Sequence, residues 1–339
     1  MHLTLVVPGL LDWPPSALNS VDEHAPALAR LLGAASEPET DEDGLVATAC
    51  RACGIAKQQD WPVAPWLAHG AGLDASDAYW LCADPARFVV SHNDVRLAGL
   101  IDDLTTDDAS ALAETLNAHF TGDGIRFIVA TTRWFARVDR APQLVTRPPQ
   151  VALGAPLLPF LATGADASRW RRWQSEMQML WFEHPVNRRR EHAGLVTIDG
   201  VWLWGGGTLV SHDVPDTRIF AGDGLMSELA RGVGLSLAPL PGGLNAVTGT
   251  TPSVFWLDAI GFDAVASQLA TIESGWLAPA ERALRAGGIR EIALVLGGRA
   301  SAITFRLTRP SLAARWRARL SPRRVAPMLS RFAGQSSGQ

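Results

Sequence analysis

The sequence predicts an α/β protein with a largely parallel sheet flanked by helices and a smaller α+β domain inserted into it. Strand-like and helix-like segments alternate along residues 195–300, which is typical of parallel sheets. Residues 86–140 instead follow a strand–strand–helix–strand order, which is typical of a compact α+β module. The chain has 339 residues, 47% hydrophobic and 19% charged, so we expect a folded protein with one large or two modest domains.

The first elements come from residues 1–80. Residues 3–7 form an apolar run that we expect to be a buried strand, ended by Pro8-Gly9. Residues 25–34 have a helical pattern that ends near Gly33. The acidic stretch after this helix, residues 37–44, is expected to be solvated surface.

The inserted module begins with two short strands around His92-Asn93-Asp94, a hairpin signal. A helix follows over residues 105–120, with Thr105 or Thr106 as its N-cap, and then a strand over residues 125–138. Residues 147–160 are rich in proline and are expected to be a linker or surface crossing. From residue 166 the pattern is strongly helical. One face of this helix carries apolar side chains: Trp170, Trp173, Met177, Leu180 and Trp181.

The remaining elements return to the parallel pattern. A strand over residues 195–207 runs into Gly205-Gly206-Gly207, and residues 220–240 indicate a helix and then a strand. Residues 253–298 read as strand, long helix and strand. We therefore predict a core from residues 1–80 and 195–305, an inserted domain from residues 81–194, and a basic tail from residues 306–339.

Charge and cysteine content limit the setting of the protein. The net charge is −4, but residues 306–339 hold eight arginines and no acid, which leaves 22 basic against 34 acidic residues elsewhere. This opposite charge favours packing of the tail on its own protein over binding to a membrane or nucleic acid. Three cysteines imply no disulfide framework, so we expect a cytoplasmic protein. No apolar run reaches the roughly 18 residues of a membrane helix.

Several motifs carry candidate chemistry. Cys50-x-x-Cys53 matches a redox or half-zinc spacing, but two small buried residues explain it better. Ser211-His212-Asp213 are adjacent in sequence, and no G-x-S-x-G motif supports a serine hydrolase. The three glycines suit either an anion-binding loop or a tight turn. Residues 184–194 place Asn187, arginines and histidines after a helix, which suits phosphate or carboxylate binding or an exposed basic connection.

Residues 175–207, containing HPVN and VWLWGGG, resemble the HPvN-x-x-R and WLWGxG pattern of archaeal-type cofactor-independent phosphoglycerate mutases. They are also similar to the mutase-like bacterial regulators called RpfE-type proteins. Residues 79–88, 104–120 and 229–249 resemble further family segments in the same order, so most of residues 1–300 can be followed. The resemblance implies an alkaline-phosphatase-like core, two divalent metals held by Asp and His, and a serine that is transiently phosphorylated.

The chain departs from the family at the metal ligands. Where the family has Asp-Gly after the first strand this chain has Pro8-Gly9, and where it has Asp-His-Gly this chain has Gly297-Gly298-Arg299. The family's acidic stretch with histidine is reduced to Asp258 and Asp263. No serine appears in the nucleophile's usual context, so the catalytic residues stay unknown. We expect no bound metal and no cofactor.

Two hypotheses follow. The first is a degenerate phosphoglycerate-mutase-like protein, a non-catalytic pseudoenzyme that regulates or binds a phosphorylated small molecule or a protein partner. The second is a divergent active phosphoglycerate mutase or phosphatase that holds manganese or zinc through Asp12, Asp258, Asp263 and a histidine such as His212. An interaction module acting through the basic tail ranks last, and nucleic acid is the least favoured partner because the body is acidic. The resemblance implies these ligand-binding residues: Asn187, Arg190, Trp202, Trp204, Gly205, Gly207 and Arg231.

Overall fold

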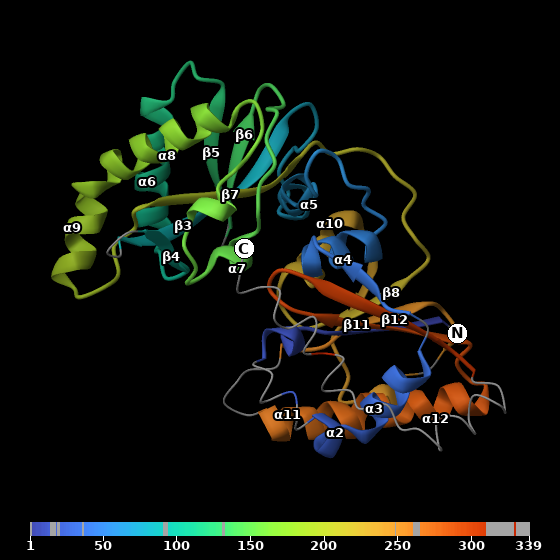
Figure 1. The fold of residues 1–339 in the computed structure, drawn as a ribbon. Coiled ribbons are helices and arrows are strands. Elements are labelled where there is room, and N and C mark those ends of the chain that lie inside the picture. The colour runs from blue at the N-terminus through green and yellow to red at the C-terminus, as the bar shows by residue number, and fades with distance from the viewer. Residues whose placement is uncertain are drawn as a thin grey trace. The chain divides into compact units, whose positions relative to one another are not determined.

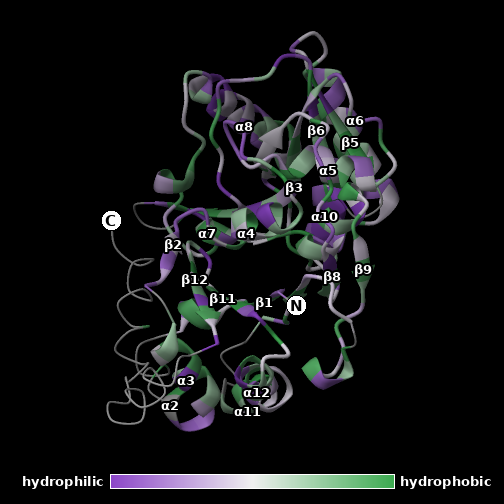
Figure 2. Cartoon of the chain, turned by 90° about the vertical axis from the view of Figure 1, so that its right-hand side faces the viewer, coloured by the Kyte–Doolittle hydropathy of each residue, from purple (hydrophilic) through white to green (hydrophobic). Residues whose placement is uncertain are grey.

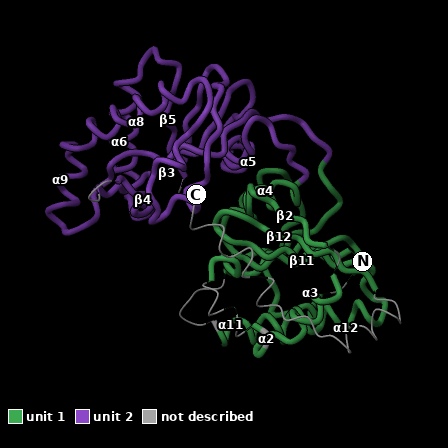
Figure 3. Tube along the Cα trace, in the orientation of Figure 1, with its two compact units in different colours: residues 1–53, 214–339 green, residues 54–213 purple. Residues whose placement is uncertain are grey.

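The computed structural model describes residues 2–13, 18, 21–35, 37–90, 94–130, 133–247, 249–259, 265–309 and 329. The chain forms two compact units, of which unit 1 comprises residues 1–53 and 214–339, and unit 2 comprises residues 54–213 (Figure 3). The sequence predicts that the inserted domain covers residues 81–194. The second unit is longer at both ends, because α5 (Val63–Gly70) packs on β3 (Tyr79–Val90) and β7 (Gly200–Gly207), which pair with each other.

Unit 1 contains a sheet with the strand order β2-β12-β11-β1-β10-β8-β9. Its strands are β1 (His2–Val7), β2 (Glu39–Asp41), β8 (Arg218–Ala221), β9 (Ser236–Ala238), β10 (Ser253–Trp256), β11 (Glu291–Gly297) and β12 (Ala302–Thr308). Strands β11, β1, β10, β8 and β9 are parallel to one another, whereas β12 is antiparallel to β11 and β2 is antiparallel to β12. This confirms the prediction of an α/β fold with a largely parallel sheet. The short strands β2 and β8 and the antiparallel β12 were not predicted.

Helices cover both faces of this sheet (Figure 1). One face carries α2 (Val21–His24), α3 (Pro26–Ala34), α11 (Val265–Ile272) and α12 (Ala278–Ala286), and the other carries α4 (Gly44–Ala52) and α10 (Leu225–Val233). Hydrophobic and hydrophilic residues share α3 and α12, as expected of helices with one buried face (Figure 2). A short 3-10 helix, Leu10–Asp12, follows β1, and another spans Leu244–Ala246. The long helix predicted over residues 262–288 is interrupted by a π-helical turn, Glu273–Leu277.

Unit 2 is an α+β structure built on antiparallel strands. The strand β3 is long: residues 79–82 pair with β6 (Arg133–Val138), residues 80–86 pair with β7, and residues 86–90 pair with β4 (Val95–Leu100). The edge strand β5 (Ile125–Ala130) pairs with β6. Residues of β3, α6 (Thr106–His119) and α8 (Ala167–Phe182) share one apolar core. Short helices α7 (Pro149–Ala152) and Leu158–Phe160 interrupt the stretch predicted as a linker.

Local signals account for the helices of unit 2. The Thr105 hydroxyl accepts the backbone N–H of Asp108 at 3.2 Å, which makes Thr105 the N-cap of α6 as predicted. The predicted apolar face of α8 is buried except for the partly buried Leu180. The single strand expected over residues 125–138 is two strands, β5 and β6. The arginine-rich connection after α8 is itself a helix, α9 (Pro185–His192).

The predicted tail begins inside β12, whose Arg306 contacts Glu39 of β2. Most of the tail, residues 310–328 and 330–339, lies outside the described residues. Leu329 is described, and it is fully buried in the hydrophobic core of unit 1. In the part of the chain that the structure describes, no helix combines the length and the hydropathy that crossing a membrane requires.

Candidate functional site

His184 fixes the start of α9, at the motif that the sequence singled out. Its Nδ1 accepts the backbone N–H of Val186 at 3.2 Å, and its Nε2 lies 3.0 Å from the Thr115 hydroxyl in α6. Because that hydroxyl donates its proton to the carbonyl of Ala111, we assign the ring proton to Nε2. Burial and then the charge of Arg189 lower the pKa of His184. The geometry therefore favours a neutral capping histidine.

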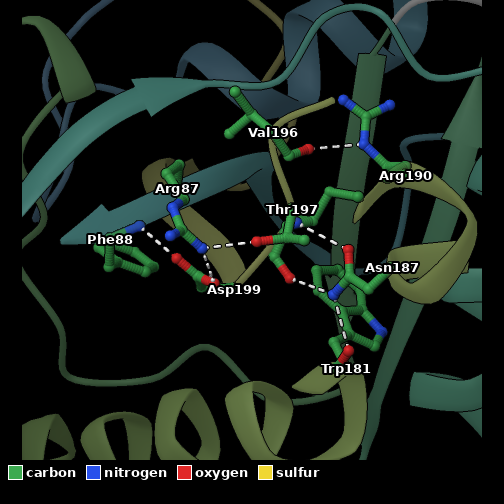
Figure 4. Close-up of polar contacts among 9 residues, drawn as sticks. Arg87, Phe88, Trp181, Asn187, Arg190, Val196, Thr197 and Asp199 are labelled. Carbon is green, nitrogen blue, oxygen red and sulfur yellow. Dashed lines mark hydrogen bonds and ion pairs between the residues drawn. The ribbon is translucent and has the colours of Figure 1, made fainter. Parts of the chain in front are cut away.

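Asn187 has its whole side-chain amide engaged inside unit 2 (Figure 4). Its Nδ2 donates to the carbonyls of Trp181 and Ile198, each at 2.7 Å, and its Oδ1 accepts the N–H of Ile198 at 2.8 Å. The residue is 4% exposed. Asn187 thus joins the end of α8 to the segment that leads into β7.

The arginines of α9 also bind within unit 2. The Arg190 side chain is 5% exposed, and its Nε donates to the carbonyl of Val196 at 2.6 Å (Figure 4). Its Nη2 contacts Asp103 at 2.7 Å. Arg189 contacts Asp108 in α6 at 2.6 Å. These contacts fasten α9 to α6 and to the residues before it. Arg190 is buried, whereas Arg188 and Arg189 are exposed, so the predicted exposed basic connection holds for part of the run.

The tryptophans of β7 are buried and hydrogen-bonded within the same unit. The indole N–H of Trp202 donates to the carbonyl of Arg147 at 2.8 Å. The indole N–H of Trp204 donates to the carboxylate of Asp84 at 2.6 Å. Their polar atoms therefore hold β7 against its neighbours.

The three glycines at the end of β7 permit close packing. Gly205 has a φ of +68°, a conformation that favours glycine. A Cβ at Gly206 would overlap the hydroxyl of Tyr79, and a Cβ at Gly207 would overlap Pro62. Of the two predicted explanations, the tight strand end therefore has direct contacts to support it.

Arg231, the seventh residue of the predicted ligand set, lies in α10 of unit 1. Its Nε donates to the carbonyl of Ser227 at 3.1 Å, and its Nη2 lies 3.2 Å from the Ser227 hydroxyl. The other six residues of the set belong to unit 2. No single unit brings all seven together.

The carboxyl ends of β1, β10 and β11 meet at one edge of the unit 1 sheet, because these strands are parallel neighbours. Pro8-Gly9 follow β1, Asp258 follows β10, and Gly298-Arg299 follow β11. Ligands of open parallel sheets bind outside this edge. We therefore take the carboxyl edge of unit 1 as the candidate functional site.

Asp12 and Arg299 lie together at this edge. The Asp12 Oδ1 accepts the backbone N–H of Arg299 at 2.8 Å. Burial raises the pKa of Asp12, and the hydrogen bond and positive charge of Arg299 offset part of this rise. A Cβ at Gly298 would lie 3.0 Å from the Asp12 Oδ1 and 3.0 Å from the Leu11 Cβ, so a larger residue there would require these neighbours to shift. The carboxylate nearest to β1 is thus already engaged by the chain itself.

A cavity of about 280 Å³ lies beside Asp258 at the end of β10. Apolar side chains form much of its lining, and α11 contributes polar groups. The lining residues are Leu240, Leu257, Asp258, Ala259, Ser267, Gln268, Thr271, Ile272 and Trp276. Asp258 was among the sequence candidates. The cavity was not predicted, because Trp276 reaches it from a π-helical turn that the periodic pattern does not reveal.

The ligands of the alternative metal site are divided between the two units. Asp12 and Asp258 belong to unit 1, and His212 belongs to unit 2, where its ring packs against Trp66 at a centroid distance of 4.8 Å. Asp263 lies outside the described residues. Among the residues that are described, no three His, Cys, Asp or Glu side chains are grouped as a metal site would require. The Cys50 and Cys53 side chains are buried, and burial raises the pKa of the Cys53 thiol to about 12.

Known proteins show a distant similarity to this chain. No family model matches it. A 2,3-bisphosphoglycerate-independent phosphoglycerate mutase of Methanothrix thermoacetophila is 24% identical over 233 residues, which cover 61% of this chain and 55% of that enzyme. The chain thus matches about half the length of its curated relative.

Two solved structures are also similar. The cofactor-independent phosphoglycerate mutase of Thermoplasma acidophilum has 14% identity and a TM-score of 0.42, with 98% of this chain and 100% of that chain covered. The PH0037 protein of Pyrococcus horikoshii has 15% identity and a TM-score of 0.48, with 100% of this chain and 98% of that chain covered. The sequence match to the Methanothrix enzyme makes the chain similar, at low identity, to a 2,3-bisphosphoglycerate-independent phosphoglycerate mutase.

Proposed function

We propose that this chain is a phosphoglycerate-mutase-like protein that no longer transfers a phosphoryl group. In this proposal it works in the cytoplasm as a regulatory or binding protein, in the manner of the RpfE-type bacterial proteins that it resembles. A phosphorylated three-carbon acid or a protein partner would be its ligand. The similarity to a phosphoglycerate mutase supports the scaffold, and the residues at the carboxyl edge of unit 1 support the loss of catalysis.

The observation that carries this proposal is the contact of Asp12 with Arg299. A divalent cation needs several oxygen or nitrogen ligands that converge on one point. At the ends of β1 and β11 the chain offers Pro8-Gly9 and Gly298-Arg299 instead of carboxylate and imidazole ligands. The Asp12 carboxylate accepts a hydrogen bond from Arg299 and is attracted by its charge. These residues do not fit the two-metal site that the resemblance implies, so no catalytic step is assigned to them.

An activity assay tests the proposal. We expect purified full-length protein, supplied with Mn²⁺ or Zn²⁺ and 3-phosphoglycerate, to give no 2-phosphoglycerate above background, while a cofactor-independent mutase assayed alongside does. Thermal denaturation with and without 3-phosphoglycerate reports binding without turnover, because a ligand of the native state raises the melting temperature. Turnover that Asp12→Asn or Asp258→Asn abolishes, together with stoichiometric bound metal, would contradict the proposal.

The second candidate is a divergent active mutase or phosphatase. The match to an enzyme of that name favours it. It requires Asp12, Asp258, Asp263 and a histidine to share metal ions, so each acidic substitution should lower both activity and metal content. Measuring activity and bound metal therefore separates the two candidates. The non-catalytic protein should show no activity and no bound metal, with or without the substitutions.

A further inference from the structure

We propose that the cavity beside Asp258 binds a small organic cation, a primary ammonium group on a short apolar body. This site lies wholly within unit 1, and the proposal does not depend on whether the chain transfers phosphoryl groups. The charge of the lining, its hydrogen-bonding capacity and its apolar walls each favour such a ligand.

The charge of the lining favours a cationic ligand over an anionic one, although Asp258 is itself exposed. Asp258 is the charged residue among the described residues that line the cavity. Within the described part of the chain, its carboxylate has no hydrogen-bond or ion-pair partner, and its Oδ1 lies close enough to Gly222 that a Cβ there would be 3.2 Å away. Carboxylates pair strongly with ammonium donors and repel phosphate groups.

The polar groups of α11 add to this preference. The Thr271 hydroxyl donates its proton to the carbonyl of Ser267 at 2.9 Å. Its oxygen therefore faces a ligand as an acceptor, as the Asp258 carboxylate does. Two acceptors in one cavity favour a ligand that brings several N–H donors, and a primary ammonium group brings three.

The walls fit an apolar body attached to that ammonium group. Leu240, Leu257, Ile272 and Trp276 line the cavity, and Trp276 packs on Phe255 at a ring-centroid distance of 5.1 Å. Aromatic walls favour organic cations, and the burial of apolar surface adds affinity. A volume of about 280 Å³ accommodates a one-ring amine. The π-helical turn that carries Trp276 is a feature often found at functional sites.

Benzylamine is the probe for this proposal, with benzyl alcohol and benzoate as its neutral and anionic counterparts. We expect isothermal titration of full-length protein at pH 7 to show binding of benzylamine and not of the other two compounds. Asp258→Asn should weaken benzylamine binding about tenfold or more, because it removes a charge-assisted hydrogen bond. Asp216→Asn is the matched control: Asp216 is exposed and lies before β8, at the opposite edge of the sheet.

The outcomes decide the proposal without reference to activity. Equal binding of benzoate and benzylamine, or no heat with benzylamine, would overturn it. Undiminished binding by Asp258→Asn would also overturn it. If Asp258→Asn proves unstable, Trp276→Phe and Thr271→Val supply independent tests. Each should lower the affinity for benzylamine and leave the melting temperature of the free protein nearly unchanged.

Discussion

At the scale of single residues, several side chains of the motif at residues 184–194 form hydrogen bonds within the fold. His184, Asn187 and Arg190 each join α9 to another segment of unit 2. The spacing of these residues was visible in the sequence. Their partners, such as Thr115 and Asp103, were not, because they lie 69 and 87 positions away along the chain. Sequence alone therefore left binding and structural roles open.

His184 gives a prediction about pH. Its pKa in the folded protein is lowered, so below about pH 6.5 the unfolded chain takes up a proton that the folded chain resists. The free energy of unfolding should therefore fall as the pH decreases from about 6.5 towards the folded-state pKa. Protonation of Nδ1 would also remove the acceptor for the N–H of Val186.

The variant His184→Asn tests this sign, because asparagine is a good N-cap that does not titrate. Urea denaturation at pH 8 and at pH 5.5 should show a smaller loss of stability for the variant than for the wild type. His2→Asn is the control, since His2 is exposed in unit 1. An unchanged pH dependence in His184→Asn would show that His184 does not resist protonation.

At the scale of elements, periodicity predicted those helices and strands that bury one complete face. Strands β1, β10 and β11 and helices α6 and α8 lie where apolar runs and caps placed them. Short elements were missed, because β2 and β8 have too few residues to show a period. The helix α9 was missed because its polar composition gives no apolar stripe, and distant partners stabilise it instead.

The π-helical turn supplies a prediction at this scale. It carries Glu273, which is 9% exposed and accepts the N–H groups of Ala27 at 2.6 Å and Leu28 at 3.3 Å, at the start of α3. A carboxylate at a helix N-terminus satisfies free N–H groups and the helix dipole. We expect Glu273→Gln to lower the free energy of unfolding by about 1–2 kcal/mol.

Urea denaturation measures this loss. Ser274→Ala is the control, since the exposed Ser274 hydroxyl bonds only to carbonyls of its own helix, those of Ala270 and Thr271. The control should stay within about 0.5 kcal/mol of the wild type. Equal stability of Glu273→Gln and the wild type would mean that α3 does not need this carboxylate.

At the scale of the whole molecule, the chain interrupts one core to build another. Unit 1 is made from two segments separated by the 160 residues of unit 2, residues 54–213. The order of the predicted elements distinguished a largely parallel α/β part of the chain from an α+β part. It did not reveal that β7 belongs to the antiparallel strands of unit 2, because an apolar strand followed by a helical pattern has the same appearance in a parallel and in an antiparallel sheet. Pairing of β7 with β3 decides the assignment.

Because each unit has its own hydrophobic core, we expect a substitution in one core to destabilise that unit and not the other. Asn187→Ala removes the side-chain partners of the Ile198 carbonyl and N–H, whereas the Trp181 carbonyl keeps the backbone N–H of His184 at 3.1 Å. We expect a cost of roughly 2–4 kcal/mol to unit 2. Hydrogen exchange followed by mass spectrometry should then show faster exchange in β3, β6 and β7, with β1 and β11 unchanged. Leu294→Ala, in the core of unit 1, is the reciprocal control and should reverse the pattern. Equal acceleration in both units by either variant would show that the chain unfolds as one cooperative whole.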